Sequence, residues 1–170
     1  MIRPARRDDR PALASLQSHL AAPSPALLDA VPAVGICLVA VDEADQPVGY
    51  LLAVDGEDTH LAELVVHPAH RREGHGRALL SALLGGLESG TRVSLAVAVD
   101  NDPARALYES AGFVPVGYRS GFYASDGDAG GESGDDAGGA VDCDADTASG
   151  GERSDADGRS SDAVIYACEV

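Results

Sequence analysis

The chain has 170 residues, of which 45% are hydrophobic, and a formal net charge of −16. This length and hydrophobic content predict one globular domain over residues 1–170 with a substantial core. Lysine is absent, so nothing forms the basic face that a nucleic-acid binder requires. The acidic balance fits either a cationic substrate or, as we favour, the acidic, lysine-free surface typical of proteins from salt-loving organisms.

The N-terminal residues and the apolar runs of the chain predict neither a signal peptide nor a membrane span. The N-terminus lacks the apolar core of a signal peptide, and no apolar run reaches membrane-spanning length. Cys37, Cys143 and Cys168 lie far apart without CxxC spacing, which is typical of reduced thiols and gives no metal site. We therefore expect a cytoplasmic protein with no membrane partner and no metal.

The first third of the chain predicts one helix and an antiparallel set of strands. A short strand over residues 2–5 precedes a helix that Asp8 or Asp9 caps, with Pro11 near its start. Apolar runs at residues 35–41, 48–54 and 61–66 are separated by polar turns and predict three successive antiparallel strands.

Residues 61–87 are the most informative stretch. The strand at 61–66 ends before Pro68, and the sequence Arg-Arg-Glu-Gly-His-Gly follows at residues 71–76. Leucines then recur with the helical period up to Leu87. A helix N-terminus with glycines lets an anion approach unpaired backbone N–H groups, and Arg71, Arg72 and Arg77 add donors for phosphate oxygens. The junction therefore predicts a phosphate site.

Two common phosphate motifs are excluded. A P-loop needs a lysine, and a dinucleotide fingerprint needs a third glycine where Leu79 stands. The remaining pattern, Arg-x-x-Gly-x-Gly after a strand ending Val-Val-His-Pro, resembles motif A of the GNAT family of N-acetyltransferases, whose loop holds the pyrophosphate of acetyl-CoA. The alternative is a glycine-rich turn with ordinary surface arginines.

A second block supports the same resemblance. Residues 101–113 match the family pattern Asn-x-x-Ala-x-x-Leu-Tyr-x-x-x-Gly-Phe, within a helix that Asp102 is expected to cap and Gly112 to end. Within the family, the chain is similar to ribosomal-protein alanine N-acetyltransferases and related N-terminal acetyltransferases. The resemblance implies an α/β fold with a central, mostly antiparallel mixed sheet, flanked by helices and splayed near the cofactor.

The resemblance also implies site residues. Tyr108 is expected to protonate the departing thiolate, its alternative being a core aromatic of an amphipathic helix. The residues expected to bind acetyl-CoA lie at the end of the third strand, in the loop and at the second motif, namely Leu64, Val65, Val66, Arg71, Arg72, Glu73, Gly74, His75, Gly76, Arg77 and Asn101.

At the position of the general base, this sequence departs from the family pattern. Enzymes of the ribosomal-protein type carry Glu and Arg where this chain has Ala96 and Ala98. Glu63, inside the central strand, and His60, at its start, are the replacements available. Each has an alternative as a solvated or hydrogen-bonded residue, and direct deprotonation by bulk water also stays open.

The last third of the chain changes composition. Residues 126–161 are rich in Gly, Asp, Ser and Ala and predict a disordered acidic loop, either a spacer or a docking arm for a basic partner. Residues 163–170 are apolar and β-prone, so they are expected to re-enter the sheet beside the strand at 113–118.

These patterns predict an acetyl-CoA-dependent N-acetyltransferase, a monomer or homodimer, acting on a primary amine. A protein or peptide N-terminus is preferred as the acceptor over a small-molecule amine or amino acid. A non-catalytic acetyl-CoA-binding module is the alternative of a different class, because Ala96 cannot accept a proton.

Overall fold

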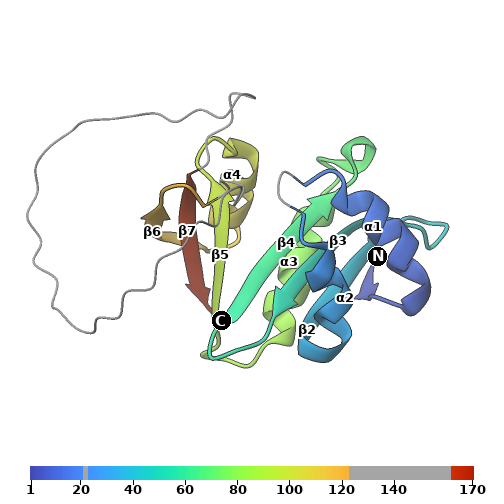
Figure 1. Cartoon of the computed structure of the whole chain (residues 1–170), viewed down its shortest axis with the longest axis horizontal. Coiled ribbons are helices and arrows are strands. Elements are labelled where there is room, and N and C mark those ends of the chain that lie inside the picture. Colours follow the sequence, from blue (N-terminus) through green and yellow to red (C-terminus); the bar gives the residue numbers. More distant parts are fainter. Residues whose placement is uncertain (21–22, 123–161) are drawn as a thin grey trace, which may run out of the picture.

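The computed structural model describes residues 1–20, 23–122 and 162–170, together with the backbone but not the side chains of 31–34. The predicted acidic loop at 126–161 and Cys143 lie outside the described residues. One seven-stranded sheet, in the order β1-β2-β3-β4-β5-β7-β6, runs through the molecule with helices on both of its faces (Figure 1).

The elements follow the predicted order closely. The strands are β1 (Ile2–Pro4), β2 (Gly35–Val41), β3 (Pro47–Val54), β4 (Thr59–Val66), β5 (Arg92–Ala98), β6 (Val114–Arg119) and β7 (Ala163–Glu169). The helices are α1 (Arg10–Gln17), α2 (Pro25–Val34), α3 (His75–Gly86) and α4 (Asp102–Ser110), with short 3₁₀ turns η1 (Arg7–Asp9) and η2 (Pro68–His70). None of the helices among the described residues is long and apolar enough to span a bilayer.

The sheet is mixed and mostly antiparallel, as predicted. Strands β1 to β4 pair antiparallel in succession, and β7 pairs antiparallel with both β5 and β6. Strand β7 therefore re-enters the sheet beside the strand after α4, which confirms its predicted pairing. The single parallel pairing joins β4 to β5 over only three residue pairs, and beyond it the two strands diverge (Figure 1).

Each face of the sheet carries its own hydrophobic core. Leu79, Leu80 and Leu83 of α3 are buried against one face together with Tyr108 and Phe113. Leucines of α1 and α2 pack on the other face against inward-facing residues of β2, β3 and β4, namely Val39, Val41, Tyr50, Leu52 and Val65. The alternation of side chains along each strand thus separates the two cores, and β4 contributes to both.

Two predicted helix caps are wrong. The side chain of Asn101, rather than Asp102, caps α4 by accepting the backbone N–H of Ala104 at 3.3 Å. Asp9 precedes α1 but makes no capping hydrogen bond to it. Its carboxylate instead accepts the N–H of Arg6 at 2.6 Å and both terminal nitrogens of Arg3, so an ion pair has taken the place of the cap.

Candidate functional site

A bulge in β4 marks the point where the sheet opens. Parallel pairing with β5 ends at Leu61, which lies opposite Leu95. At the same place the register with β3 shifts, because Ala53 pairs with Leu61 and Leu52 with Glu63, leaving Ala62 as the extra residue. From Ala62 to Val66, β4 has no partner strand on its β5 side among the described residues. This backbone edge is available to hydrogen-bond a ligand between the diverging strands.

The loop after β4 presents a helix N-terminus to the same opening. Gly74 is the N-cap of α3 with φ of +85°, a left-handed conformation that favours glycine, and it supplies no capping side chain. The first intrahelical bond runs from the N–H of Ala78 to the carbonyl of Gly74. The backbone N–H groups of residues 75–77 come before this first bond and have no acceptor within the helix. Together with the helix dipole, they favour an anion here.

Gly76 allows the start of α3 to lie close to α4 and to the end of β4. A Cβ atom on Gly76 would lie 3.2 Å from Leu107 Cδ2 and 3.9 Å from Val66 Cγ2. The first of these distances is tighter than ordinary contact, so with alanine at this position the Leu107 side chain would have to move by a few tenths of an ångström. The glycines, the exposed helix start and the nearby arginines together fit a diphosphate group.

The charged side chains of the loop are exposed. Arg71 donates from Nε to the carbonyl of Val66 at 3.2 Å, which ties the loop back to β4. Arg72 adopts a positive φ of 66°, and both Arg72 and Arg77 are exposed. Glu73 lies between two imidazoles, with its Oε2 3.3 Å from His70 Nδ1 and 3.2 Å from His75 Nε2.

Glu63 is held in a buried polar network beneath α1 and α2. The residue is 5% exposed. Its carboxylate accepts hydrogen bonds from Gln17 Nε2 at 3.0 and 3.1 Å, from the backbone N–H of Ser24 at 2.8 Å and from Tyr50 Oη at 2.6 Å. All of these donors are neutral groups, so the network supplies directed dipoles rather than a compensating positive charge.

The network changes the chemistry of its members. Desolvation, followed by the hydrogen bond to Glu63, raises the pKa of Tyr50 well above its usual range, so this phenol stays protonated and donating. Sequence reasoning missed Gln17, Ser24 and Tyr50 as partners of Glu63. One signal was present: Gln17 follows Leu13 and Leu16 on the same helical stripe, where an apolar residue is usual.

The other predicted catalytic residues occupy different surroundings. Tyr108 is 7% exposed, and its ring packs edge-on against Phe113 with centroids 5.9 Å apart. His60 is exposed, and its Nδ1 lies 3.2 Å from Ser94 Oγ within the segment where β4 and β5 still pair. Desolvation of its ring lowers the pKa of His60. Asn101 was expected to contact the cofactor, but its side-chain oxygen accepts the hydrogen bond that caps α4.

The structure places Glu63 on the same face of the sheet as Ala96. Val93, Leu95 and Val97 of β5 point into the core beneath α3 and α4, so Ala96 points to the opposite face. Glu63 belongs to that opposite face because of the bulge at Ala62. Tyr108 lies in the core on the α3 and α4 side. The candidate base and the candidate acid therefore lie on different faces of the sheet.

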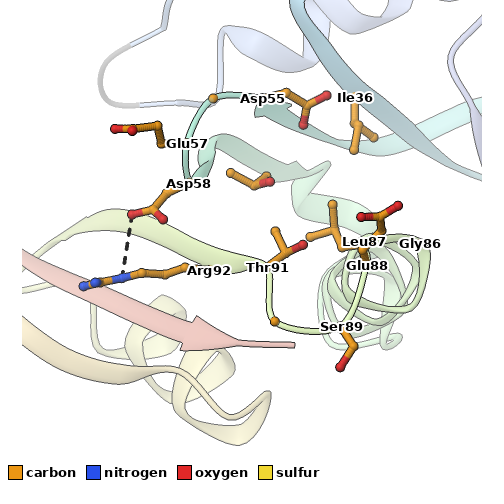
Figure 2. A pocket seen from close by; sticks show the side chains of 13 residues that line it. Ile36, Asp55, Glu57, Asp58, Gly86, Leu87, Glu88, Ser89, Thr91 and Arg92 are labelled. Carbon is orange, nitrogen blue, oxygen red and sulfur yellow. Dashed lines mark ion pairs between the residues drawn. The ribbon is translucent and has the colours of Figure 1, made fainter.

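A surface pocket lies at the other end of β4 and α3. It has a volume of about 740 Å³ and is open to solvent; its side chains come from the turn before β4 and from the α3–β5 connection. Figure 2 shows Asp55, Glu57, Asp58 and Glu88 around it, with Arg92 paired to Asp58 at 3.8 Å. None of the predicted site residues lines this pocket.

Comparison with known proteins identifies the family. The model of the acetyltransferase (GNAT) family matches residues 5–113. A mycothiol acetyltransferase from Clavibacter sepedonicus is 44% identical over 75 residues, which cover 44% of this chain and 24% of that protein. The N-alpha-acetyltransferase RimI of Mycobacterium tuberculosis is 48% identical over 58 residues, covering 34% of this chain and 36% of RimI. The chain thus spans about a quarter to a third of the length of these curated relatives.

Solved structures share the fold of this chain. The ribosomal-protein-S18-alanine N-acetyltransferase from Escherichia coli superposes with a TM-score of 0.73 at 23% identity, covering 100% of this chain and 93% of that one. A GNAT family acetyltransferase from Elizabethkingia anophelis, solved with acetyl-CoA bound, gives a TM-score of 0.69 at 16% identity, covering 100% and 97%. With the family model matching well over half of its residues, the chain belongs to the acetyltransferase (GNAT) family.

Proposed function

We propose that this protein transfers the acetyl group of acetyl-CoA to a primary amine, with a protein or peptide N-terminus as the preferred acceptor. One observation carries the proposal: the start of α3, which lacks a capping side chain, and the edge of β4 that has no partner strand among the described residues adjoin the same opening in the sheet. An elongated cofactor with a diphosphate at one end and a thioester at the other matches this arrangement.

The residues at the opening fit each part of acetyl-CoA. Gly74, Gly76 and the first turn of α3 offer backbone N–H groups to the diphosphate, with Arg71, Arg72 and Arg77 exposed around them. The β4 edge at Leu64–Val66 offers backbone groups to the pantetheine and to the thioester carbonyl. Acetyl-CoA supplies the activated acetyl group, and the chain supplies position and proton transfer.

The reaction needs proton transfers that side chains of this chain can perform. The neutral amine nitrogen forms a C–N bond to the acetyl carbon, the C–S bond breaks, and the products are the N-acetylated amine and the free thiol. The ammonium form of the acceptor must first lose a proton to a base. The acylated nitrogen then gives up its second proton, and the departing thiolate gains one; the Tyr108 phenol is the proposed donor to the thiolate and is restored by the proton from the nitrogen.

We assign the base to Glu63 in preference to His60. Glu63 shares a sheet face with Ala96, the position at which related enzymes carry a glutamate, and lies one strand away from it. It is next to the bulge, where β4 parts from β5. His60 lies where the two strands remain paired and is bonded to Ser94. The neutral donors around Glu63 also leave its charge uncompensated, which favours a cationic acceptor nearby.

A small-molecule amine is the second candidate acceptor. The matches to mycothiol acetyltransferases support it, and so do Ala96 and Ala98, which lack the side chains of the ribosomal-protein type. A non-catalytic acetyl-CoA-binding module is the third candidate. The three candidates differ in whether the thiol product is released and in which amine is acetylated.

The test is thiol release from acetyl-CoA in high potassium chloride, with peptides starting in Ala, Ser, Met or Thr and with a panel of small amines. Turnover on a peptide supports the preferred acceptor, and turnover on small amines alone supports the second. Tight binding of acetyl-CoA without turnover on any amine supports the module. A chain that neither binds nor consumes acetyl-CoA contradicts the proposal.

A further inference from the structure

The loop before α3 gathers histidines around one carboxylate. Four of the five histidines form a continuous run, with ring centroids 5.2 Å apart for His19 and His67, 5.9 Å for His67 and His70, and 6.3 Å for His70 and His75. The nitrogen and oxygen atoms of His70, Glu73 and His75 all lie within 4.8 Å of one another. We propose that these three side chains bind a divalent transition-metal ion of the zinc class.

The distances suit tetrahedral coordination. Zinc binds imidazole nitrogen and carboxylate oxygen at about 2.0–2.2 Å, which places neighbouring tetrahedral ligands about 3.3–3.5 Å apart. Glu73 Oε2 lies 3.3 Å from His70 Nδ1 and 3.2 Å from His75 Nε2. Both contacts to Glu73 therefore have the spacing of neighbouring tetrahedral ligands, and the ligand atoms of His70 and His75 lie within 4.8 Å of each other.

The ligand set is also chemically selective. Two imidazoles and one carboxylate suit zinc, cobalt and nickel better than magnesium or calcium, which prefer oxygen ligands. All three residues come from one short segment, with His75 held at the start of α3 and His70 in η2. His70 and His75 are half-buried and Glu73 is exposed, so the site keeps an open side for a fourth ligand.

A bound ion would change the charge of the phosphate site. Glu73 is a negative charge within a loop that otherwise attracts anions through Arg71, Arg72 and the start of α3. With a divalent cation bound, the carboxylate and the ion together carry a net charge of +1. This consequence rests on the proposed function: the ion and acetyl-CoA are expected to favour each other's binding, and the coupling must be reciprocal.

The metal site is tested without the cofactor. Tag-free protein is titrated with zinc in a calorimeter, in a buffer without chelating thiols, and with cobalt while the visible absorption of tetrahedral cobalt is followed. We expect one ion per chain. Binding should be at least 10-fold weaker in His70→Ala and in His75→Ala, because losing a ligand should cost at least as much as losing a hydrogen-bond partner of a ligand, which costs about 10- to 100-fold. His60→Ala is the matched control, because His60 lies outside the cluster, and it is expected to keep the wild-type affinity.

The outcomes separate the two proposals. The metal site is overturned if zinc does not bind saturably. It is also overturned if zinc binds equally well to the wild type, His70→Ala and His75→Ala while their circular dichroism is unchanged. The coupling is tested by measuring acetyl-CoA affinity with zinc and after its removal, in the wild type and in Glu73→Ala. Tighter binding with zinc in the wild type alone supports it, and an equal effect of zinc on both overturns it. Failure to bind acetyl-CoA with or without zinc contradicts the proposed function and leaves the calorimetric result on zinc standing.

Discussion

Glu63 and Glu73 carry the same carboxylate group in opposite surroundings, one on each side of the end of β4. Glu63 is 5% exposed and accepts bonds from an amide, a backbone N–H and a phenol. The side chain of Glu73 is 53% exposed and contacts two imidazoles. The donors around Glu63 are neutral groups, whereas the imidazoles around Glu73 belong to a class of side chain that transition metals accept as ligands.

This difference separates two ways of using a negative charge. A buried carboxylate surrounded by fixed dipoles is preorganised, because its position is set before any ligand binds. An exposed carboxylate between two histidines is accessible to ions and ligands from solution. We therefore expect substitutions near Glu63 to alter turnover strongly, and those in the Glu73 loop to alter binding of charged ligands.

Glu63→Gln is expected to have the largest effect. The substitution keeps the shape of the side chain and removes its ability to take a proton, so kcat should fall about 10³-fold, within the usual range for a general base. Stability should fall by about 1–2 kcal/mol because charge-assisted bonds are lost. Thiol release and thermal unfolding measure the two effects. Glu57→Gln, at an exposed turn residue, is the control; an unchanged kcat in Glu63→Gln would remove Glu63 as the base.

Tyr108→Phe is expected to lower kcat about 10²-fold by removing a proton donor. The ring contact with Phe113 stays, so the packing of α4 and the acetyl-CoA affinity should change little. Tyr118→Phe removes an exposed hydroxyl that donates to Asp162 at 2.8 Å, and it should leave turnover intact. If both variants retain full activity, Tyr108 is a core aromatic residue only.

Gly74→Ala is expected to weaken acetyl-CoA binding about 10-fold. A φ of +85° is unfavourable for alanine by about 1–2 kcal/mol, so the start of α3 must shift. Gly85→Ala is the matched control, because it lies inside α3 and its Cβ would meet nothing within 4 Å. That variant should gain about 0.5–1 kcal/mol of stability. Equilibrium binding of acetyl-CoA and thermal unfolding measure the two effects. An affinity of Gly74→Ala for acetyl-CoA equal to that of the wild type would count against the anion site.

Asp9 provides an intermediate case, buried like Glu63 but paired with a cation. The hydrogen bond from Arg3 is the main cause that holds the pKa of Asp9 below its usual 3.8. Its stabilisation is therefore complete above that value and is lost as pH falls through the lower folded-state pKa. Asp9→Asn should lower the melting temperature at pH 7. The difference in melting temperature between this variant and the wild type should become smaller below about pH 4. A difference in melting temperature that stays constant from pH 7 to pH 2 would contradict this predicted pH dependence.

Features with local causes were predictable from sequence. The loop at residues 71–76 and the leucine stripe of α3 depend on neighbouring residues, and they lie where the spacing placed them. The strands and their order followed from apolar runs and turns, helped by the family resemblance. The cap of α4 was assigned one residue too late, because Asn101 and Asp102 are both good capping residues and only the backbone conformation distinguishes them.

Features with distant causes were not predictable. The partners of Glu63 come from 46, 39 and 13 residues away, and they meet only after α1 and α2 pack on the sheet. The bulge at Ala62 depends on the register between β3 and β4, which no local pattern specifies. Asp9 could have capped α1, but the guanidinium of Arg3, brought alongside by β1, is the stronger partner.

The short contact between β4 and β5 divides the sheet into two hydrogen-bonded units that share a narrow seam. Only three residue pairs cross it, so backbone amides along the β4 edge beyond Leu61 should take up deuterium faster than those at the centre of either unit. A ligand that fills the seam would add bonds across it and tie the two units together. Slower exchange confined to this edge would then report occupancy directly, independent of any chemistry the protein performs.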